Sequence, residues 1–174
     1  MSQNKSILLI YTGGTIGMFK GADGSLKPFD FEKLTAEIPE LKKFDIELNA
    51  IAFKKPIDSS NIIPKTWVYL ANLIGQHYQQ YDGFVILHGS DTMAYTASAL
   101  SFLLEDLCKP VILTGSQLPI GIRRTDAKEN LITAIEIAAS GNTPEVCVYF
   151  EYKLLRGNRT VKVNAEHFEA FDSP

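Results

Sequence analysis

Two kinds of hydrophobic pattern alternate along the chain. Short apolar runs are typical of strands buried on both faces of a parallel sheet, and they occur at residues 6–11, 83–87, 110–114 and 145–150. A further strand is predicted where apolar and polar side chains alternate, at 44–53. Segments suited to amphipathic helices lie between the strands, at 31–38, 64–80, 91–105 and 126–139. Helices that recur between strands predict an α/β protein with three α/β/α layers and a mainly parallel sheet.

Two stretches depart from this alternation. Residues 152–163 contain a Gly-Asn pair at 157–158, which predicts a β-hairpin. Residues 18–30 are rich in Gly, Lys and Asp and show no clear period. Connections of that length in compact domains are usually lids, binding loops or disordered segments.

The composition indicates one folded domain and excludes several classes of protein. The chain has 174 residues, of which 45% are hydrophobic and 21% charged, and its net charge is −3. Disordered chains, collagen-like fibres and coiled coils have other compositions. No run of Lys and Arg suits a nucleic acid backbone, and no apolar stretch approaches the ~20 residues that span a membrane. The first apolar run is too short for a secretory signal, so we expect a cytoplasmic location.

The two cysteines, Cys108 and Cys147, are too few for a disulfide framework or a four-ligand zinc site. Each stands beside apolar residues, which predicts that both are buried free thiols. We expect neither a metal ion nor a cofactor.

The polar motifs that could carry chemistry follow predicted strands. In an open parallel sheet, ligands bind outside the carboxyl ends of the strands, where the strand order reverses. We expect four segments to converge there, namely 12–17, 58–61, 89–92 and 114–117.

The first motif, TGGTIG at 12–17, presents Thr15 between glycines that allow the backbone to approach a ligand closely. A threonine hydroxyl in this position is a candidate nucleophile if a base lies nearby. The alternative is a tight turn that only connects a strand to a loop. A phosphate loop is disfavoured, because neither glycine-rich phosphate motif is matched.

The second motif, HGSDTM, places Ser90 and Asp91 at the start of a predicted helix, where either could simply be the N-cap. The functional hypothesis is that both face the same cleft as Thr15 and that the Asp91 carboxylate pairs with a substrate ammonium. His88 ends an apolar strand, and we expect it to be a hydrogen-bonded histidine of the core.

Three further residues have both a structural and a functional interpretation. The loop at 58–61, which contains Asp58 and Ser59, either forms a turn before a helix or binds a substrate carboxylate through its hydroxyls and backbone N–H groups. Lys162 is either a solvated surface lysine or, if partly buried, a base. In the functional interpretation Asp91 orients the amine, and the amine activates a hydroxyl such as that of Ser90. The residues alone therefore indicate a small-molecule enzyme with a hydroxyl nucleophile.

Taken together, these motifs resemble the bacterial L-asparaginases, in particular the cytoplasmic type I form. The matching segments are in order and cover essentially the whole chain: YTGGTIG at 11–17, DSS at 58–60, GFVILHGSDTMAYTASAL at 83–100, KPVILTGSQLP at 109–119 and RGNRT at 156–160. The resemblance implies an asparaginase/glutaminase-like, flavodoxin-like fold. It also implies hydrolysis of L-asparagine to L-aspartate and ammonia without a metal or cofactor.

The resemblance also assigns roles to individual residues. Thr15 matches the nucleophilic threonine of the family, Ser90 and Asp91 match its Thr-Asp pair, and Lys162 matches its lysine. The remaining assignments concern substrate binding: the loop for the α-carboxylate and amino end (Asp58, Ser59), the partner of the α-ammonium (Asp91), a backbone carbonyl near the carboxamide (Ser116), and a mobile lid (16–30).

The chain departs from the family in three ways. Ser90 stands where most members have Thr, and it keeps the hydroxyl. The lid lacks the tyrosine that members commonly carry there, because Phe19 and Phe29 have no hydroxyl and Ser25 is the nearest polar candidate. Residues 1–174 match the N-terminal catalytic domain, and the smaller C-terminal domain of the family is absent from them. Family members also complete each site with a neighbouring subunit, so the full-length form is expected to be a homo-oligomer, a dimer or tetramer.

Two alternatives share the same motifs. One is an amino-acid-binding domain of this fold that is incomplete or non-catalytic. The other is an asparaginase-like amidotransferase subunit that deamidates Gln on tRNA. The presence of Thr15, Asp91 and Lys162 favours a hydrolase, because a binder needs no nucleophile, and the sequence shows no basic surface for RNA.

Overall fold

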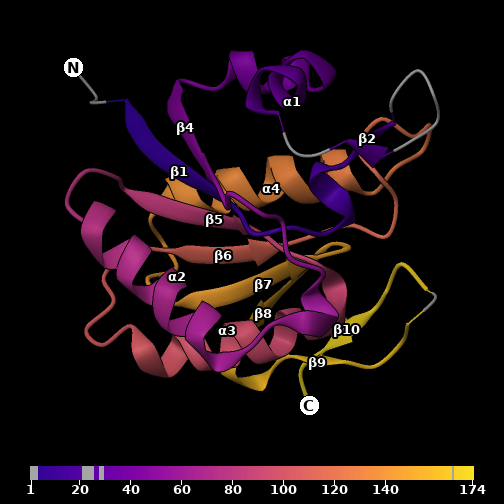
Figure 1. The fold of residues 1–174 in the computed structure, drawn as a ribbon. Helices are drawn as coiled ribbons and strands as arrows, with labels where there is room; N and C mark the ends of the chain where they lie inside the picture. Colours follow the sequence, from indigo (N-terminus) through magenta and orange to yellow (C-terminus); the bar gives the residue numbers. More distant parts are fainter. Residues whose placement is uncertain (1–3, 21–25, 28–29, 166) are drawn as a thin grey trace.

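A six-stranded sheet forms the centre of the computed structural model, which describes residues 4–20, 26–27, 30–165 and 167–174 (Figure 1). The strand order is β4-β1-β5-β6-β7-β8. The strands are β1 (Lys5–Tyr11), β4 (Ile46–Ala52), β5 (Gly83–Leu87), β6 (Val111–Thr114), β7 (Val146–Phe150) and β8 (Lys153–Arg156). All neighbouring strands are parallel except β8, which is antiparallel to β7. The predicted mainly parallel sheet is confirmed.

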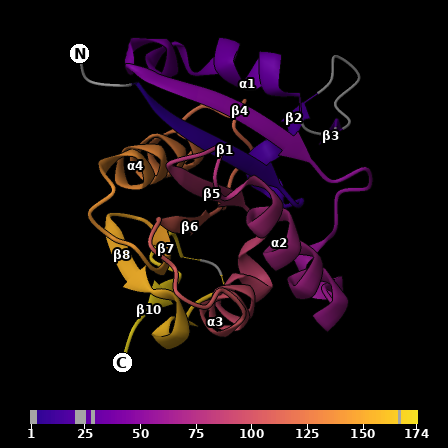
Figure 2. The same ribbon diagram turned by 90° about the vertical axis from the view of Figure 1, so that its left-hand side faces the viewer.

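Helices cover both faces of the sheet, so the three predicted layers are present (Figure 2). One face carries α1 (Phe31–Glu37) and α4 (Ala127–Ser140), and the other carries α2 (Pro64–His77) and α3 (Met93–Leu103). Successive residues of β1 enter opposite cores: Leu9 packs in the cluster on the α4 side and Leu8 in the cluster on the α2 side. Both faces are buried, which explains why the strand is a continuous apolar run.

Local chemistry sets several element boundaries. Pro64 occupies the first turn of α2, where its missing N–H loses no helical bond. Gly141 ends α4 with a left-handed φ of 69°. The helix predicted at 91–105 begins with a 3-10 turn, η4 (Ser90–Thr92), and becomes α3 only at Met93. The other short elements are η1 (Thr15–Gly17), η2 (Pro39–Lys43), η3 (Ser59–Asn61), β2 (Phe19–Lys20) and β3 (Leu26–Lys27).

The hairpin predicted at 152–163 is wrong in its position. The Gly-Asn pair lies in the 3-10 turn η5 (Gly157–Arg159), and the hairpin turn stands earlier, at Glu151 and Tyr152 between β7 and β8. These two residues adopt positive φ of 44° and 64°, values that hairpin turns usually give to Gly or Asn. A tertiary contact supports them, because the Glu151 N–H donates to Asn130 Oδ1 at 3.1 Å.

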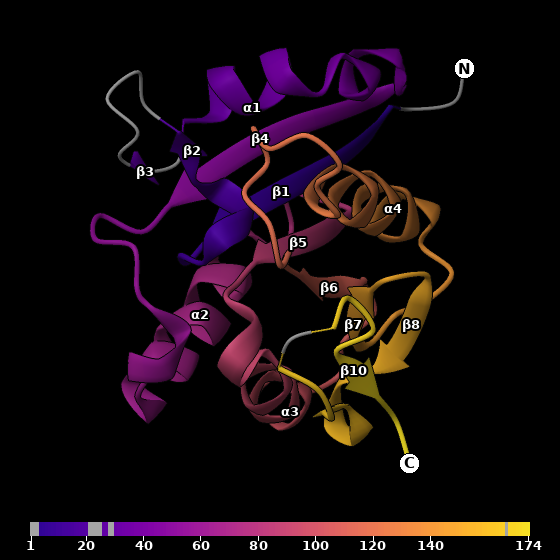
Figure 3. The ribbon, with the colours of Figure 1, turned by 90° about the vertical axis from the view of Figure 1, so that its right-hand side faces the viewer.

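Lys162 belongs to a different strand pair. After η5, β9 (Val161–Lys162) pairs antiparallel with β10 (Phe171–Asp172) near the end of the chain. Figures 1 and 3 show β10 beside α3, and η5 also contacts α3. The two-stranded ribbon therefore lies next to the helix that follows Ser90 and Asp91.

Two further expectations can be compared with the structure. Cys147 is buried as predicted, whereas Cys108 is exposed. Cys108 lies in the connection from α3 to β6, and such connections run over the surface even beside apolar residues. In the predicted lid, β2 and β3 pair antiparallel, and Ser25 and Phe29 lie outside the described residues. Within the described ranges, no helix has the length and apolarity to cross a membrane.

Candidate active site

The register of the sheet brings two polar motifs to the same edge. Tyr11 of β1 is level with Leu87 of β5, so the residues after each strand emerge together. The backbone N–H and the hydroxyl of Thr12 both donate to Leu87 O, at 3.0 Å each. Because β4 and β5 lie on opposite sides of β1, this edge is also where the strand order reverses.

Glycine allows the first motif to lie directly against the second. Gly14 has φ 88°, and a Cβ placed on it would be 2.5 Å from Gly89 N. Tyr11 stabilises this turn, because its hydroxyl donates to Gly14 O at 3.2 Å. Burial raises the pKa of Tyr11 to about 12, so the phenol keeps its proton at neutral pH. The turn presents Thr15, the next residue, beside the motif that contains Ser90.

Three of the four predicted segments line one cavity of about 420 Å³. Its lining residues are Gly14, Thr15, Met18, Pro56, Ile57, Asp58, Ser59, Gly89, Ser90 and Asp91. Thr15 is partly buried there, and its hydroxyl has no hydrogen-bond partner among the described residues. The candidate nucleophile therefore faces the cavity without an internal bond to break.

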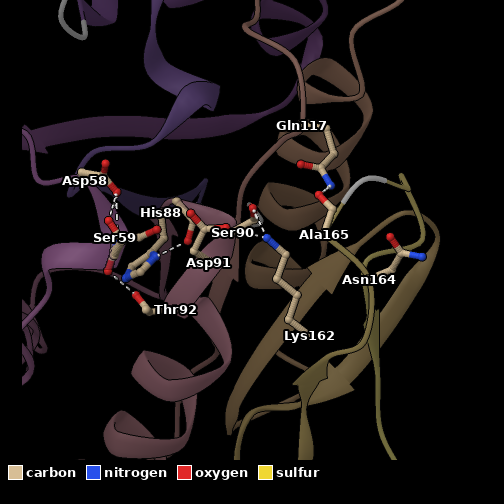
Figure 4. Close-up of polar contacts among 12 residues, drawn as sticks. Asp58, Ser59, His88, Ser90, Asp91, Thr92, Gln117, Lys162, Asn164 and Ala165 are labelled. Carbon is tan, nitrogen blue, oxygen red and sulfur yellow. Dashed lines mark hydrogen bonds and ion pairs between the residues drawn. The ribbon is translucent and has the colours of Figure 1, made fainter.

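Lys162 reaches the same motif from β9 (Figure 4). Its Nζ donates to Ser90 Oγ at 3.0 Å and to Asp91 Oδ1 at 2.7 Å. The Lys162 side chain is only 15% exposed, whereas that of Asp91 is 63% exposed. The amine thus lies between a hydroxyl and a carboxylate in the arrangement that a proton relay requires.

Hydrogen bonds within the loop at 58–61 and from the loop to η4 fix its position. Asp58 Oδ1 accepts from the hydroxyl and the N–H of Ser60, at 2.8 and 3.0 Å. These bonds lower the pKa of the Asp58 carboxyl, which is therefore ionised at neutral pH. Ser59 is buried, and its carbonyl accepts from Thr92 Oγ1 at 2.6 Å (Figure 4). This bond joins η3 to η4 across the cavity wall.

The fourth segment, 114–117, approaches the site without lining the cavity. A Cβ on Gly115 would be 2.5 Å from His88 O, so the segment packs against the end of β5. Ser116 is buried, and its hydroxyl donates to Leu118 O at 2.6 Å. Gln117 contacts the segment before β10, where its Nε2 donates to His167 O at 2.9 Å.

Sequence reasoning missed two residues that hold this segment. Asp126 is buried, and its carboxylate accepts from the N–H of Gln117 at 2.8 Å and from that of Leu118 at 3.1 Å. Asn130 donates from Nδ2 to Gly115 O at 3.0 Å. Both residues lie at the start of α4, and an acidic residue followed by an amide one turn later was the only available signal.

His88 is a hydrogen-bonded residue of the core, as predicted. It is fully buried at the end of β5, and burial lowers the pKa of its imidazole to about 4. Over the part of the chain that the structure describes, no three His, Cys, Asp or Glu side chains are grouped to hold a metal ion.

Comparisons with known proteins match this architecture. The family model for the N-terminal region of asparaginase matches residues 6–174. L-asparaginase 1 of Escherichia coli K12 is 48% identical over 174 residues, which are 99% of this chain and 52% of that protein. The chain thus spans about half the length of the curated relatives it matches first.

Solved structures of L-asparaginases have the same fold as this chain. L-asparaginase I of Vibrio cholerae superposes with a TM-score of 0.89 at 46% identity, covering 98% of this chain and 52% of that one. The thermostable L-asparaginase of Thermococcus kodakarensis has a TM-score of 0.90 at 35% identity, covering 97% of this chain and 51% of that one. With a family model over nearly its whole length and this fold, the chain belongs to the asparaginase family, whose N-terminal region it matches.

Proposed function

We propose that this chain is the catalytic domain of an amidohydrolase that converts L-asparagine to L-aspartate and ammonia, with Thr15 as the nucleophile. One observation carries the proposal. The hydroxyl of Thr15 shares a cavity with Asp58, Ser59 and Asp91, and Lys162 is hydrogen-bonded at the edge of the same cavity. Attack on the amide of an amino acid needs these groups, namely a nucleophile, two carboxylates and an amine.

The reaction proceeds in two steps. Thr15 Oγ attacks the side-chain amide carbon, the C–N bond breaks, and the threonine proton leaves with the nitrogen as ammonia. Water then adds to the acyl carbon, the ester bond to Thr15 breaks, and the threonine regains a proton. Ser90 and Lys162 carry protons between these groups while Asp91 orients the amine, and such transfer contributes roughly 10²–10⁴-fold to rate.

Backbone and charge supply the remaining requirements. The N–H of Ser90, at the start of η4, donates to the oxyanion that forms on the amide oxygen. The carboxylates of Asp91 and Asp58 pair with the substrate's α-ammonium, and the loop that contains Ser59 holds its α-carboxylate. This charge pattern selects amino acids over simple amides. The role of Ser116 near the carboxamide, the cytoplasmic location and the homo-oligomeric state stay predictions.

The test is ammonia release from L-asparagine, with L-glutamine alongside. Thr15→Ala should abolish release while the circular dichroism spectrum stays unchanged. Thr133→Ala is the matched control, because Thr133 lies on α4 and does not line the cavity. Among the described residues, its hydroxyl has a hydrogen bond only to the exposed Glu129 side chain. Folded wild-type chain that releases no ammonia, or release that persists in Thr15→Ala, would contradict the proposal.

A further inference from the structure

A buried series of hydrogen bonds ends on the backbone of the site, and the proposed chemistry does not use it. Nδ1 of His88 lies 2.7 Å from Gly89 O. Nε2 of the same ring lies 2.9 Å from Oγ1 of Thr96 on α3. Nε1 of Trp67, on α2, lies 3.0 Å from the same Thr96 oxygen. The series therefore connects two helices to Gly89, the second residue after the end of β5.

For a neutral imidazole, only one assignment of protons satisfies all three contacts. A carbonyl oxygen can only accept, so Nδ1 of His88 carries the hydrogen and Nε2 is an acceptor. The Thr96 hydroxyl must then donate to Nε2, and it accepts from Trp67, whose indole N–H can only donate. Because burial lowers the pKa of His88 to about 4, the imidazole stays neutral at neutral pH and this assignment holds.

The contact on Gly89 acts directly on the next N–H. The carbonyl of Gly89 and the N–H of Ser90 belong to one planar trans peptide, in which they point in opposite directions. A carbonyl held towards the buried His88 ring therefore directs the Ser90 N–H away from that ring. Donation to the carbonyl also polarises the peptide and strengthens the N–H as a donor.

Packing confines Gly89 at its Cα. A Cβ on Gly89 would be 2.5 Å from Ser59 Oγ, so glycine is needed there for close approach. Its φ of −71° and ψ of 142° are open to any residue. Glycine has the widest choice of backbone conformation, so its peptide needs a specific partner to stay in one orientation. Gly89 is the N-cap of η4, so its carbonyl accepts the first bond of that turn. The His88 imidazole is a second donor to the same carbonyl, from outside the turn.

We propose that His88 is a positioning residue for the active site: Thr96 and Trp67 hold its imidazole in the Nδ1–H tautomer, and the imidazole orients the Gly89–Ser90 peptide. The catalytic consequence rests on the proposed function, because it concerns the Ser90 N–H as oxyanion donor. The orientation of the peptide does not depend on which reaction the site performs.

The experiment compares Thr96→Val with Thr96→Ser, and with Thr66→Val as a control. Thr66 is a buried threonine of α2 and precedes Trp67 in the chain. The Thr66 hydroxyl has no hydrogen bond among the described residues. Nitrogen NMR of the imidazole should show His88 as the Nδ1–H tautomer in wild type, Thr96→Ser and Thr66→Val. Thr96→Val should populate the Nε2–H tautomer and shift the amide resonances of Ser90.

Kinetics of ammonia release supply the second arm. Thr96→Val should lower kcat about 10-fold with little change in KM, a smaller loss than the 10²–10³-fold of a deleted oxyanion donor. Thr96→Ser should restore kcat, which a loss of general packing would not explain. An Nε2–H tautomer in wild type, or an unmoved Ser90 amide in Thr96→Val, overturns the proposal, as does an unchanged kcat. Wild-type chain without turnover refutes only the proposed function, because the NMR arm needs no substrate.

Discussion

Replacing Gly14 by Ala tests the contact that brings Thr15 to the second motif. Gly14 combines φ 88° with ψ 166°, a region that is essentially restricted to glycine and costs other residues about 1–3 kcal/mol. The new Cβ would also lie 2.5 Å from Gly89 N and 2.8 Å from His88 C. Favourable contacts between heavy atoms need about 3.5–4.0 Å.

The clash cannot be relieved cheaply, because the opposing atoms are backbone at the end of a buried strand. One side of the contact must move by about 1 Å, and overpacking of this kind costs about 1–3 kcal/mol. Together the two effects predict that Gly14→Ala lowers the free energy of unfolding by about 2–6 kcal/mol. Ammonia release should also fall, because the same displacement moves Thr15 away from Ser90.

Gly141→Ala is the matched control for the backbone conformation. Gly141 has φ 69°, and a Cβ there would meet nothing within 4 Å. Its substitution should lower the free energy of unfolding by only about 1–2 kcal/mol, which is the cost of a non-glycine residue in the left-handed conformation. Urea unfolding followed by tryptophan fluorescence measures both changes, since the chain has one tryptophan, Trp67. A Gly14→Ala variant no less stable than Gly141→Ala would refute the close approach.

Two other predictions concern charge. His88 has a pKa of about 4 in the folded chain against about 6.5 when unfolded, so the unfolded state binds its proton first as the pH falls. The stability that His88 contributes is complete above pH 6.5 and declines by about 2 kcal/mol at pH 5. The free energies of unfolding of wild type and His88→Gln, measured by urea titration, should therefore converge as the pH falls. Parallel plots of these free energies against pH would contradict this. Lys162→Met should change the free energy of unfolding by less than about 1 kcal/mol, because Asp91 is 63% exposed. It should nevertheless reduce ammonia release by about 10²–10⁴-fold, and activity within tenfold of wild type would exclude Lys162 from the relay.

The periodicity of the chain predicted its elements closely, and the errors have physical causes. The strand at 83–87 was predicted with the bounds that β5 has, because a run buried on both faces can only be apolar. The hairpin was misplaced because a Gly-Asn pair is a strong local turn signal, whereas the Glu151–Tyr152 turn depends on a contact with Asn130, distant in the chain. Cys108 was misjudged because apolar neighbours do not show which side of a loop faces solvent.

The candidate site also divides into features that the sequence determined and features that it did not. Sequence alone determined which chemical groups the molecule carries and that they follow strands, since hydrophobic period reports burial and the motifs are contiguous. It could not decide whether Lys162 meets Asp91, 71 positions away, or is a solvated lysine, and it could not show that 114–117 stays outside the cavity. Nor could it determine the tautomer of His88, which depends on partners from two helices. These contacts arise from strand order, register and helix packing, so only the tertiary structure decided them.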